Sequence, residues 1–383
     1  ISQAAHEFFP PRLRDGFFPP RLRGGRGGSI WNCPEAPPNE FGGGIYEGKV
    51  DPDAPAVFLQ TSGSTGTPKI AVLSYGNLRA NAEASNRNIP LAPGDVWLLT
   101  LPLYHVSGLG VLFRCLAAQA TVAVPGEGET LAESIESYRP THVSLVTTQL
   151  YRMMETPAGV RALITLKAIL LGGSAMPPQL IREALDYGLP IHTSYGLTET
   201  ASQVATTTST DRDEESLRRA TPLYLESVRI SSEGEIEVSG PTLFLGYKEG
   251  NAVARPSTPD GWFPTGDLGQ LDAEGRLTVL GRKDNLFISG GENIQPEEIE
   301  RELCALAGVE AAVVVPVEDA EFGHRPVAFV KPDPDAKYLR EALRRRLPGY
   351  KIPVAFHPWP SDLDAPGLKL QRHAFIAEAR RRM

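Results

Sequence analysis

A short run of hydroxyl-bearing residues and glycines, ending in a lysine, is the first feature of this sequence that could do chemistry. It follows the apolar run 56–60 and reads Thr61, Ser62, Gly63, Ser64, Thr65, Gly66, Thr67, Pro68, Lys69. The glycines let a backbone approach a ligand closely, the hydroxyls offer hydrogen-bond donors, and Lys69 adds a positive charge. This pattern predicts a loop that holds the phosphates of a nucleotide, with a flexible linker as the alternative. It is not the GxxxxGK[ST] loop, because Ile70 follows the lysine and the glycine spacing differs.

Four further segments follow this loop in order. They are 194–199 (SYGLTE), 261–267 (GWFPTGD), 281–284 (GRKD) and 290–294 (GGENI). With these segments the chain resembles, over about residues 55–383, the adenylate-forming superfamily of acyl-CoA synthetases, luciferases and adenylation domains. Such enzymes activate a carboxylate by attack on the α-phosphate of ATP and then pass the acyl group to a thiol. The resemblance therefore implies an acid-thiol ligase that uses ATP, Mg²⁺ and CoA.

The same resemblance implies a role for each motif residue. The loop would cover the β- and γ-phosphates, Glu199 would hold Mg²⁺, and Thr198 would contact the α-phosphate. Tyr195 would lie against the adenine. The implied nucleotide-binding residues are Thr61, Ser62, Gly63, Ser64, Thr65, Gly66, Lys69, Gly172, Gly173, Ser174, Tyr195, Gly196, Asp267 and Arg282.

Several of these residues have ordinary alternatives. Asp267 resembles the ribose-binding carboxylate of the superfamily, because a carboxylate can accept hydrogen bonds from two neighbouring hydroxyls. It could instead cap a turn after Gly266. The glycines at 172 and 173 end a predicted buried strand and would let the nucleotide approach the backbone, although a tight turn would look much the same. For Glu199 the alternative is simple solvation.

Two more residues are catalytic candidates. Lys369 lies in GLKLQR, which resembles the segment whose lysine bridges the substrate carboxylate and the α-phosphate during adenylation. In the usual pattern the lysine follows glycine directly, whereas Leu368 intervenes here. His105 lies in a segment, 102–110, whose aromatic or histidine residue gates the acyl pocket in the superfamily. A histidine packed at a strand end is the alternative.

Arg282 and Asp284 match the interdomain junction of the superfamily, where the arginine contacts the ribose and the aspartate acts as the hinge. The composition also changes at this point. We therefore expect an irregular segment over 1–50, a large domain over 51–281, a hinge at 282–284 and a small domain over 285–383. In the superfamily the small domain rotates between the two half-reactions, and the loop 289–293 would face the site during thiol transfer.

Apolar runs and amphipathic stretches predict the elements that position these residues. The runs AVFLQ, VWLLTL, ATVAV, HVSLVT, AILLG and PIHTS predict strands, with helices such as 131–138 and 178–187 between them. This alternation favours a mainly parallel α/β sheet. After Ala220, short strands split by turns predict an antiparallel, barrel-like portion. Beyond the hinge, helices over 296–306 and 338–347 with two strands between them predict a mobile α+β domain. We therefore expect an α/β protein with a large N-terminal domain of mixed sheets flanked by helices and a small C-terminal domain.

Length, charge and cysteine usage exclude other classes. A chain of 383 residues that is 41% hydrophobic can bury a sizeable core. A net charge of -8 gives no drive toward nucleic acid, and no uncharged apolar run approaches the roughly 18 residues of a membrane span. Cys33, Cys115 and Cys304 lack the spacing of a zinc or disulfide framework. We expect a cytoplasmic protein that binds a small carboxylic acid, ATP and CoA, with a homodimer left open.

Within the superfamily, the segments LPLYHVSGLGVLFR, LLGGSAMP and YGLTETAS are similar to the 2-succinylbenzoate-CoA ligases of menaquinone biosynthesis. Their aromatic dicarboxylate calls for a cation or strong donor beyond the reactive carboxylate, for which Arg114, His105 and Ser107 are candidates by position. Arg114 could equally snorkel to water. The alternatives are another fatty or aromatic acyl-CoA synthetase, or a non-catalytic nucleotide-binding relative. The last is suggested because fewer residues precede the phosphate loop here than in most of the superfamily.

Overall fold

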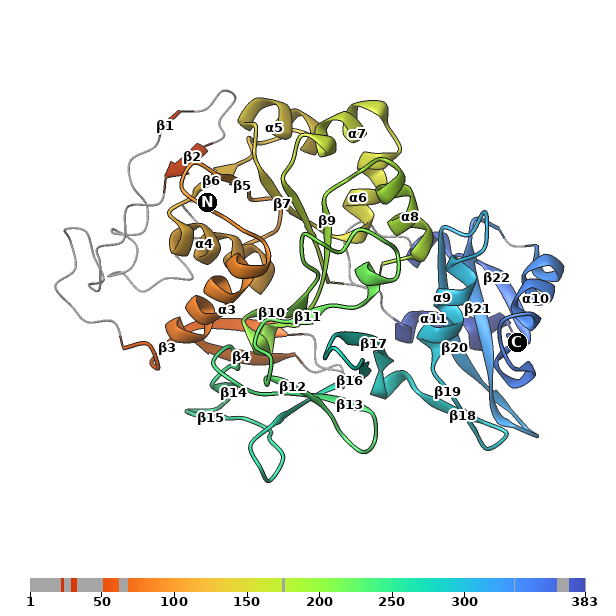
Figure 1. Cartoon of the computed structure of the whole chain (residues 1–383). Coiled ribbons are helices and arrows are strands. Elements are labelled where there is room, and N and C mark those ends of the chain that lie inside the picture. Colours follow the sequence, from red (N-terminus) through yellow and green to blue (C-terminus); the bar gives the residue numbers. More distant parts are fainter. Residues whose placement is uncertain are drawn as a thin grey trace.

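A nine-stranded sheet forms the centre of the large domain. The computed structural model describes residues 22–23, 29–32, 51–61, 68–173, 176–333, 335–363 and 372–382. The strands of the sheet are β1 Leu22–Arg23, β2 Ser29–Asn32, β5 Val96–Leu98, β6 Thr121–Val124, β7 His142–Leu145, β8 Ala168–Leu171, β9 Ile191–Leu197, β10 Ser202–Thr206 and β11 Thr221–Pro222. Their order is β1-β2-β6-β5-β7-β8-β9-β10-β11 (Figure 1). Strands β6, β5, β7, β8 and β9 run parallel, whereas β2 and β10 join them antiparallel. The predicted parallel α/β sheet is therefore confirmed.

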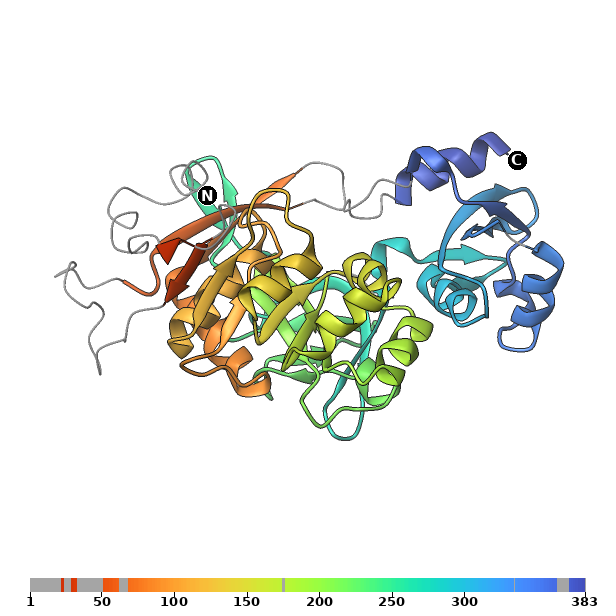
Figure 2. The ribbon, with the colours of Figure 1, turned by 90° about the horizontal axis from the view of Figure 1, so that it is seen from above.

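Helices cover both faces of this sheet, as Figure 2 shows from above. They are α3 Tyr75–Asn88, α4 Val106–Ala118, α5 Leu131–Tyr138, α6 Thr147–Met154, α7 Pro157–Ile164 and α8 Pro178–Asp186. Alternate side chains of the strands face opposite ways, so that Trp97 packs with α4 while its neighbour Leu98 packs with α5 to α8. Every residue of β7 and β8 is buried, as expected for strands covered on both sides. The helices predicted at 131–138 and 178–187 are confirmed.

Two four-stranded antiparallel sheets complete the large domain. One has the order β15-β14-β4-β3, and the other has the order β12-β13-β16-β17. Their bounds are β3 Pro55–Thr61, β4 Lys69–Ser74, β12 Val228–Ile230, β13 Glu235–Val238, β14 Gly246–Glu249, β15 Ala252–Ala254, β16 Phe263–Leu271 and β17 Leu277–Arg282. The antiparallel portion expected after Ala220 is present. The strand AVFLQ is also present as β3, but it pairs antiparallel with β4 and does not join the parallel sheet.

The small C-terminal domain has the expected α+β character and its own core. It contains β18 Phe287–Ser289, β19 Glu292–Ile294, α9 Pro296–Cys304, β20 Ala311–Asp319, β21 Gly323–Lys331, α10 Ala336–Arg344, β22 Ala355–Pro358 and α11 Arg372–Arg382. Strands β20, β21 and β22 form one sheet, with α9 and α10 on one face and α11 on the other. This domain lies at one end of the molecule, where α9 contacts α8 and β17 (Figures 1 and 2).

Part of the N-terminal segment departs from the expectation. Residues 1–50 were predicted to be irregular, but Ser29–Asn32 forms β2 and adds an antiparallel edge to β6. Most of the segment lies outside the described residues. Cys115 and Cys304 are buried in the cores of the large and the small domain. Within the described part of the chain, none of the helices combines the length and the apolar character needed to traverse a bilayer.

Candidate active site

Asp267 lies where three predicted site residues meet. Side chains along β16 alternate between buried and partly exposed, and Asp267 is on the buried side with 7% of its surface exposed. Its Oδ2 accepts a hydrogen bond of 2.8 Å from the hydroxyl of Tyr195, and its Oδ1 accepts one of 3.1 Å from Arg282. Burial, and then the negative charge of Asp267, raise the pKa of Tyr195 well above its usual range. The structure thus brings together residues from β9, β16 and the end of β17.

Arg282 connects this cluster to the predicted hinge. It pairs with Asp267 across β16 and β17, and its guanidinium also donates to the carbonyl of Thr265 and to Asp284, each at 3.1 Å. Although burial opposes the charged form, the carboxylates of Asp267 and Asp284 raise the pKa of Arg282. The next residue, Lys283, donates to Glu233 at 2.7 Å and to Glu235 at 2.8 Å. Arg282 and Lys283 are therefore held to the large domain by several charged contacts.

The glycine before Asp267 has a steric reason. Gly266 has a φ of +74°, and a Cβ there would lie 2.7 Å from the guanidinium of Arg282. Its N–H donates to Glu235 at 2.9 Å. Any other residue would strain the backbone and push Arg282 away from Asp267. The Thr-Gly-Asp sequence thus forms an irregular point within β16, where the register with β13 shifts, and this irregularity sets the position of the aspartate.

Glu199 has a partner that the sequence did not indicate. The hydroxyl of Tyr247, on β14, donates to Oε1 of Glu199 at 2.6 Å, and the ring of Tyr247 lies 4.9 Å from Nζ of Lys69. Burial, and then the charge of Glu199, raise the pKa of Tyr247, so the hydroxyl stays protonated and donates. Tyr247 follows a glycine but lies in no motif that would have marked it as a site residue. Thr198 begins the same short 3-10 turn, Thr198–Thr200.

The predicted phosphate loop lies mostly outside the described residues, which include only its two ends. Thr61 and Lys69 pair at the ends of β3 and β4, and the hydroxyl of Thr61 donates to the carbonyl of Lys69 at 3.4 Å. Lys69 is exposed. The loop residues without described placement are Ser62, Gly63, Ser64, Thr65, Gly66 and Thr67.

At two of the other predicted glycines, Gly172 and Gly196, the backbone is approached closely by protein atoms. A Cβ on Gly172 would lie 2.8 Å from the hydroxyl of Ser194, and Gly173 has a φ of +86°. Ser174 lies outside the described residues. A Cβ on Gly196 would lie only 1.7 Å from the carbonyl oxygen of Ser202. Contact between β9 and β10 therefore requires glycine at 196, whether or not a nucleotide binds there.

Arg114 does not reach water, so the snorkelling alternative is wrong. Its side chain on α4 is 1% exposed, lies 5.2 Å from the Trp97 ring, and donates from Nη2 to Ser202 at 3.3 Å. Ser202 has a φ of +117°, which is unusual for a residue other than glycine. Nε and Nη1 of Arg114 have no hydrogen-bond partner among the described residues. Burial lowers the pKa of Arg114 to about 10.

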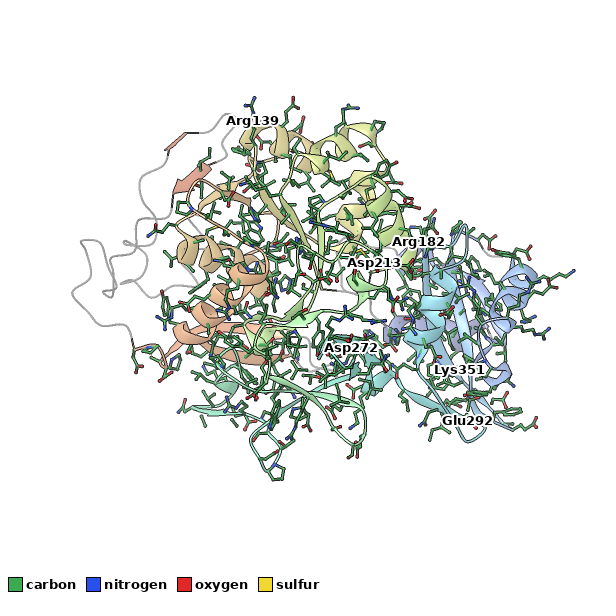
Figure 3. The ribbon with its side chains drawn as sticks, in the orientation of Figure 1. Arg139, Arg182, Asp213, Asp272, Glu292 and Lys351 are labelled. Atoms are coloured by element: carbon green, nitrogen blue, oxygen red, sulfur yellow. The ribbon has the colours of Figure 1, made fainter. Side chains whose placement is uncertain are left out.

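The remaining catalytic candidates are His105, which the structure describes, and Lys369, which it does not. His105 is exposed at the N-terminus of α4, and its ring lies 4.6 Å from that of Tyr104, so it is not the packed histidine of the alternative. Lys369 lies outside the described residues, but Arg372, three positions later at the start of α11, donates to the partly buried Glu300. The loop 289–293 is a tight hairpin between β18 and β19. Figure 3 shows Glu292, on this hairpin, at the lower edge of the small domain.

Comparisons with known proteins agree with this arrangement. The AMP-binding enzyme family matches residues 31–248, and the AMP-binding enzyme C-terminal domain matches residues 298–365. A 2-succinylbenzoate-CoA ligase of Salmonella typhimurium is 42% identical over 316 residues, which are 82% of this chain and 67% of that protein.

Solved structures give the same result. The o-succinylbenzoate CoA synthetase of Bacillus subtilis in complex with the acyl-adenylate intermediate OSB-AMP has a TM-score of 0.71 and 35% identity, covering 81% of this chain and 66% of that one. The structure of the same enzyme in complex with ATP and magnesium ion also has a TM-score of 0.71 and 35% identity, and the match covers 84% of this chain and 70% of that one. The chain thus spans about two thirds of the length of the relatives it matches. It belongs to the AMP-binding enzyme family, as the order of its motifs predicted.

Proposed function

We propose that this protein is a 2-succinylbenzoate-CoA ligase, which forms an acyl-adenylate from the acid and ATP and then transfers the acyl group to CoA. The observation that carries the proposal is that Tyr195 and Arg282, from two other segments of the chain, both donate to the carboxylate of Asp267. The identity to the Salmonella ligase and the likeness to a ligase structure that holds an acyl-adenylate support it.

In this proposal Asp267 accepts hydrogen bonds from the ribose hydroxyls of ATP. Arg282 orients the carboxylate, because its guanidinium already donates to Oδ1. Tyr195 orients the other oxygen and presents its ring to the adenine. Lys69 and the loop 61–69 bind the β- and γ-phosphates, and Thr198 contacts the α-phosphate, where the substrate carboxylate attacks.

Glu199 fits the role of a Mg²⁺ ligand. Carboxylate oxygens are the ligands that Mg²⁺ prefers, and Tyr247 engages Oε1 of Glu199. The described residues contain no group of three acidic, histidine or cysteine side chains that could hold a metal ion by themselves. Mg²⁺ in such a site is commonly held by one or two carboxylates together with substrate phosphates. When bound, Mg²⁺ neutralises negative charge that grows on the phosphates during adenylation.

Arg114 supports an acid with a second negative group. A buried cation without a carboxylate partner is costly, because it has lost its hydration without gaining a compensating charge. Arg114 is such a buried cation, and no carboxylate among the described residues pairs with it. The second carboxylate of 2-succinylbenzoate would supply the missing partner. The other two candidates are near the start of the same helix, with His105 as its N-cap and Ser107 in its first turn.

The small domain supplies the second half of the proposal. Lys369 bridges the substrate carboxylate and the α-phosphate during adenylation. Rotation about the hinge 282–284 then moves Lys369 away and brings the hairpin 289–293 toward the site for CoA. The domains are those predicted from the sequence, 51–281 and 285–383. A cytoplasmic location, where ATP and CoA are available, and a homodimer belong to the same proposal.

A screen of carboxylic acids tests this function. The protein is incubated with ATP, Mg²⁺, CoA and one acid at a time, and the AMP formed is measured. We expect 2-succinylbenzoate to give the highest kcat/KM, and benzoate, which lacks the second carboxylate, to give a value at least tenfold lower. Omission of CoA should leave acid-dependent pyrophosphate exchange intact. AMP formation with a fatty acid and none with 2-succinylbenzoate would contradict the substrate, and no exchange with any acid would contradict the activity.

A further inference from the structure

Tyr247 lies between two groups of the proposed nucleotide site. Its hydroxyl donates to Glu199 at 2.6 Å, and a hydrogen bond of this length to a carboxylate is strong and directional. The same ring lies 4.9 Å from Nζ of Lys69, within the range of a cation–π contact. One side chain thus contacts the carboxylate assigned to the metal and the lysine assigned to the phosphates.

The surroundings of Tyr247 hold its ring in place. Tyr247 pairs with Ala71 across β14 and β4, two residues after Lys69 in the chain. The ring packs edge to face against Phe244 at 4.9 Å. Gly246 has a φ of +147°, and a Cβ there would lie 2.6 Å from the carbonyl of Ala254, so this strand packs closely against its neighbour β15. The hydroxyl therefore has little freedom to turn away from Glu199.

The segment 244–247 also fixes the backbone of Glu199. The N–H of Phe244 donates to the carbonyl of Glu199 at 2.8 Å. Glu199 is consequently held twice by the same segment, at its main chain by Phe244 and at its carboxylate by Tyr247. A purely structural tyrosine would have no need of this carboxylate, because its hydroxyl could bond to a backbone carbonyl as that of Tyr224 does with Ala80.

We propose that Tyr247 is a positioning residue for adenylation, which orients the carboxylate of Glu199 toward the metal that accompanies ATP and steadies Lys69 beside the phosphates. The proposal rests on the proposed function, because it takes Glu199 as the Mg²⁺ ligand. Groups that orient metal ligands commonly change metal affinity by about 10- to 100-fold when they are removed.

Calorimetric titration of ATP, with and without Mg²⁺ and in the absence of acid and CoA, tests this role. For the wild type we expect Mg²⁺ to strengthen ATP binding. In Tyr247→Phe the ring under Lys69 remains while the hydroxyl is lost. We therefore expect the metal-free affinity for ATP to match that of the wild type and the gain from Mg²⁺ to fall about tenfold. The Mg²⁺ concentration for half-maximal pyrophosphate exchange should rise by a similar factor, with kcat largely restored at saturating Mg²⁺.

Tyr224→Phe is the matched control. Tyr224 also donates its hydroxyl, at 3.0 Å, and also has a cation over its ring, Arg87 at 5.5 Å, but it does not contact Glu199. We expect the control to lower the melting temperature about as much as Tyr247→Phe and to leave the gain from Mg²⁺ unchanged. An unchanged gain in Tyr247→Phe, or an equal loss in both variants, would overturn the inference. A wild type that binds no ATP under any condition would overturn the proposed function instead.

Discussion

Both oxygens of Asp267 are already engaged by protein donors, so a ribose bound as we propose would share the carboxylate with Tyr195 and Arg282. Asp267→Asn keeps the size of the side chain but removes its charge and one acceptor. Since a hydrogen bond to a charged group contributes about 1.5–3 kcal/mol, we expect ATP affinity to fall by roughly 10- to 100-fold. Calorimetry measures this directly.

The matched control for Asp267 is Asp272→Asn. Asp272 follows the same strand and pairs with Arg276 at 3.0 Å, and Figure 3 shows it on the large domain. Its substitution removes an aspartate–arginine contact outside the Tyr195, Asp267 and Arg282 cluster. ATP affinity should stay within twofold of the wild type. An equal loss in both variants would point to a general effect of altered charge and against a ribose contact.

Arg114 offers a test in which function and stability move in opposite directions. Arg114→Met removes a buried charge that has no carboxylate partner among the described residues, so we expect the free energy of unfolding to stay equal or rise by about 1 kcal/mol. The KM for 2-succinylbenzoate should rise about tenfold or more, because the second carboxylate loses its partner. Denaturant titration and pyrophosphate exchange give the two values.

The contrasting variant for this test is Arg372→Met. Arg372 is also largely buried, but it donates to Glu300, whose side chain is 14% exposed and would lose its cationic partner. This variant should lose stability by about 3 kcal/mol or more. If Arg114→Met lost as much, Arg114 would be a structural residue and the substrate assignment would fail.

The sequence predicts most of the site at the residue scale because its motifs are local. Tyr195, Asp267 and Arg282 each sit within a recognisable run, and the structure brings them together. Tyr247 lies in no such motif. Its place in the site results from the pairing of β14 with β4, which brings together residues distant in the chain. The burial of Arg114 is likewise a tertiary property, since an apolar helix alone leaves a long side chain free to reach water.

At the scale of elements, the approach of β9 to β10 depends on one missing Cβ. Gly196→Ala would place that atom 1.7 Å from the carbonyl oxygen of Ser202, so one strand must move. We expect a loss of about 2 kcal/mol or more of stability and a weaker nucleotide site, because Tyr195 precedes this residue and Glu199 follows it. Gly349→Ala is the control, since nothing lies within 4 Å of its added Cβ. It should change the free energy of unfolding by less than about 0.5 kcal/mol, and similar losses in the two variants would contradict the steric argument.

Element types follow from the sequence more readily than their partners do. The central strands are short apolar runs between amphipathic stretches, which is enough to predict a covered parallel sheet. The strand AVFLQ has the same apolar character. As β3, however, it pairs antiparallel with β4, the next strand in the chain, and does not join the parallel sheet. Strand β2 lies in a proline-rich stretch whose pattern does not predict a strand, and it forms by pairing with the edge of β6.

At the scale of the whole molecule, the two domains have separate cores but share a polar junction. Glu297, on α9, accepts from Asn285 and, at 3.5 Å each, from the backbone N–H of Arg282 and the guanidinium of Arg372. The carboxylate of Glu297 on α9 therefore contacts both Asn285 and the start of α11. Arg372 follows Lys369 by three positions in the sequence, so in the proposed mechanism this junction would link the segment of the catalytic lysine to the hinge.

The last prediction separates the two half-reactions. If Lys369 acts only while the small domain presents it to ATP, Lys369→Ala should lower acid-dependent pyrophosphate exchange by about 100-fold or more, the usual effect of removing a group that stabilises charge in the transition state. Transfer to CoA from a supplied acyl-adenylate should stay within a few-fold of the wild type. Lys351→Ala is the control in the same domain, where Lys351 pairs with Glu298 on α9 and is labelled in Figure 3. This control should affect the two half-reactions equally and only slightly, because it removes a partly exposed ion pair. Equal loss of both half-reactions in Lys369→Ala would mean that the lysine supports the small domain as a whole, and domain rotation would no longer explain how one site serves two reactions.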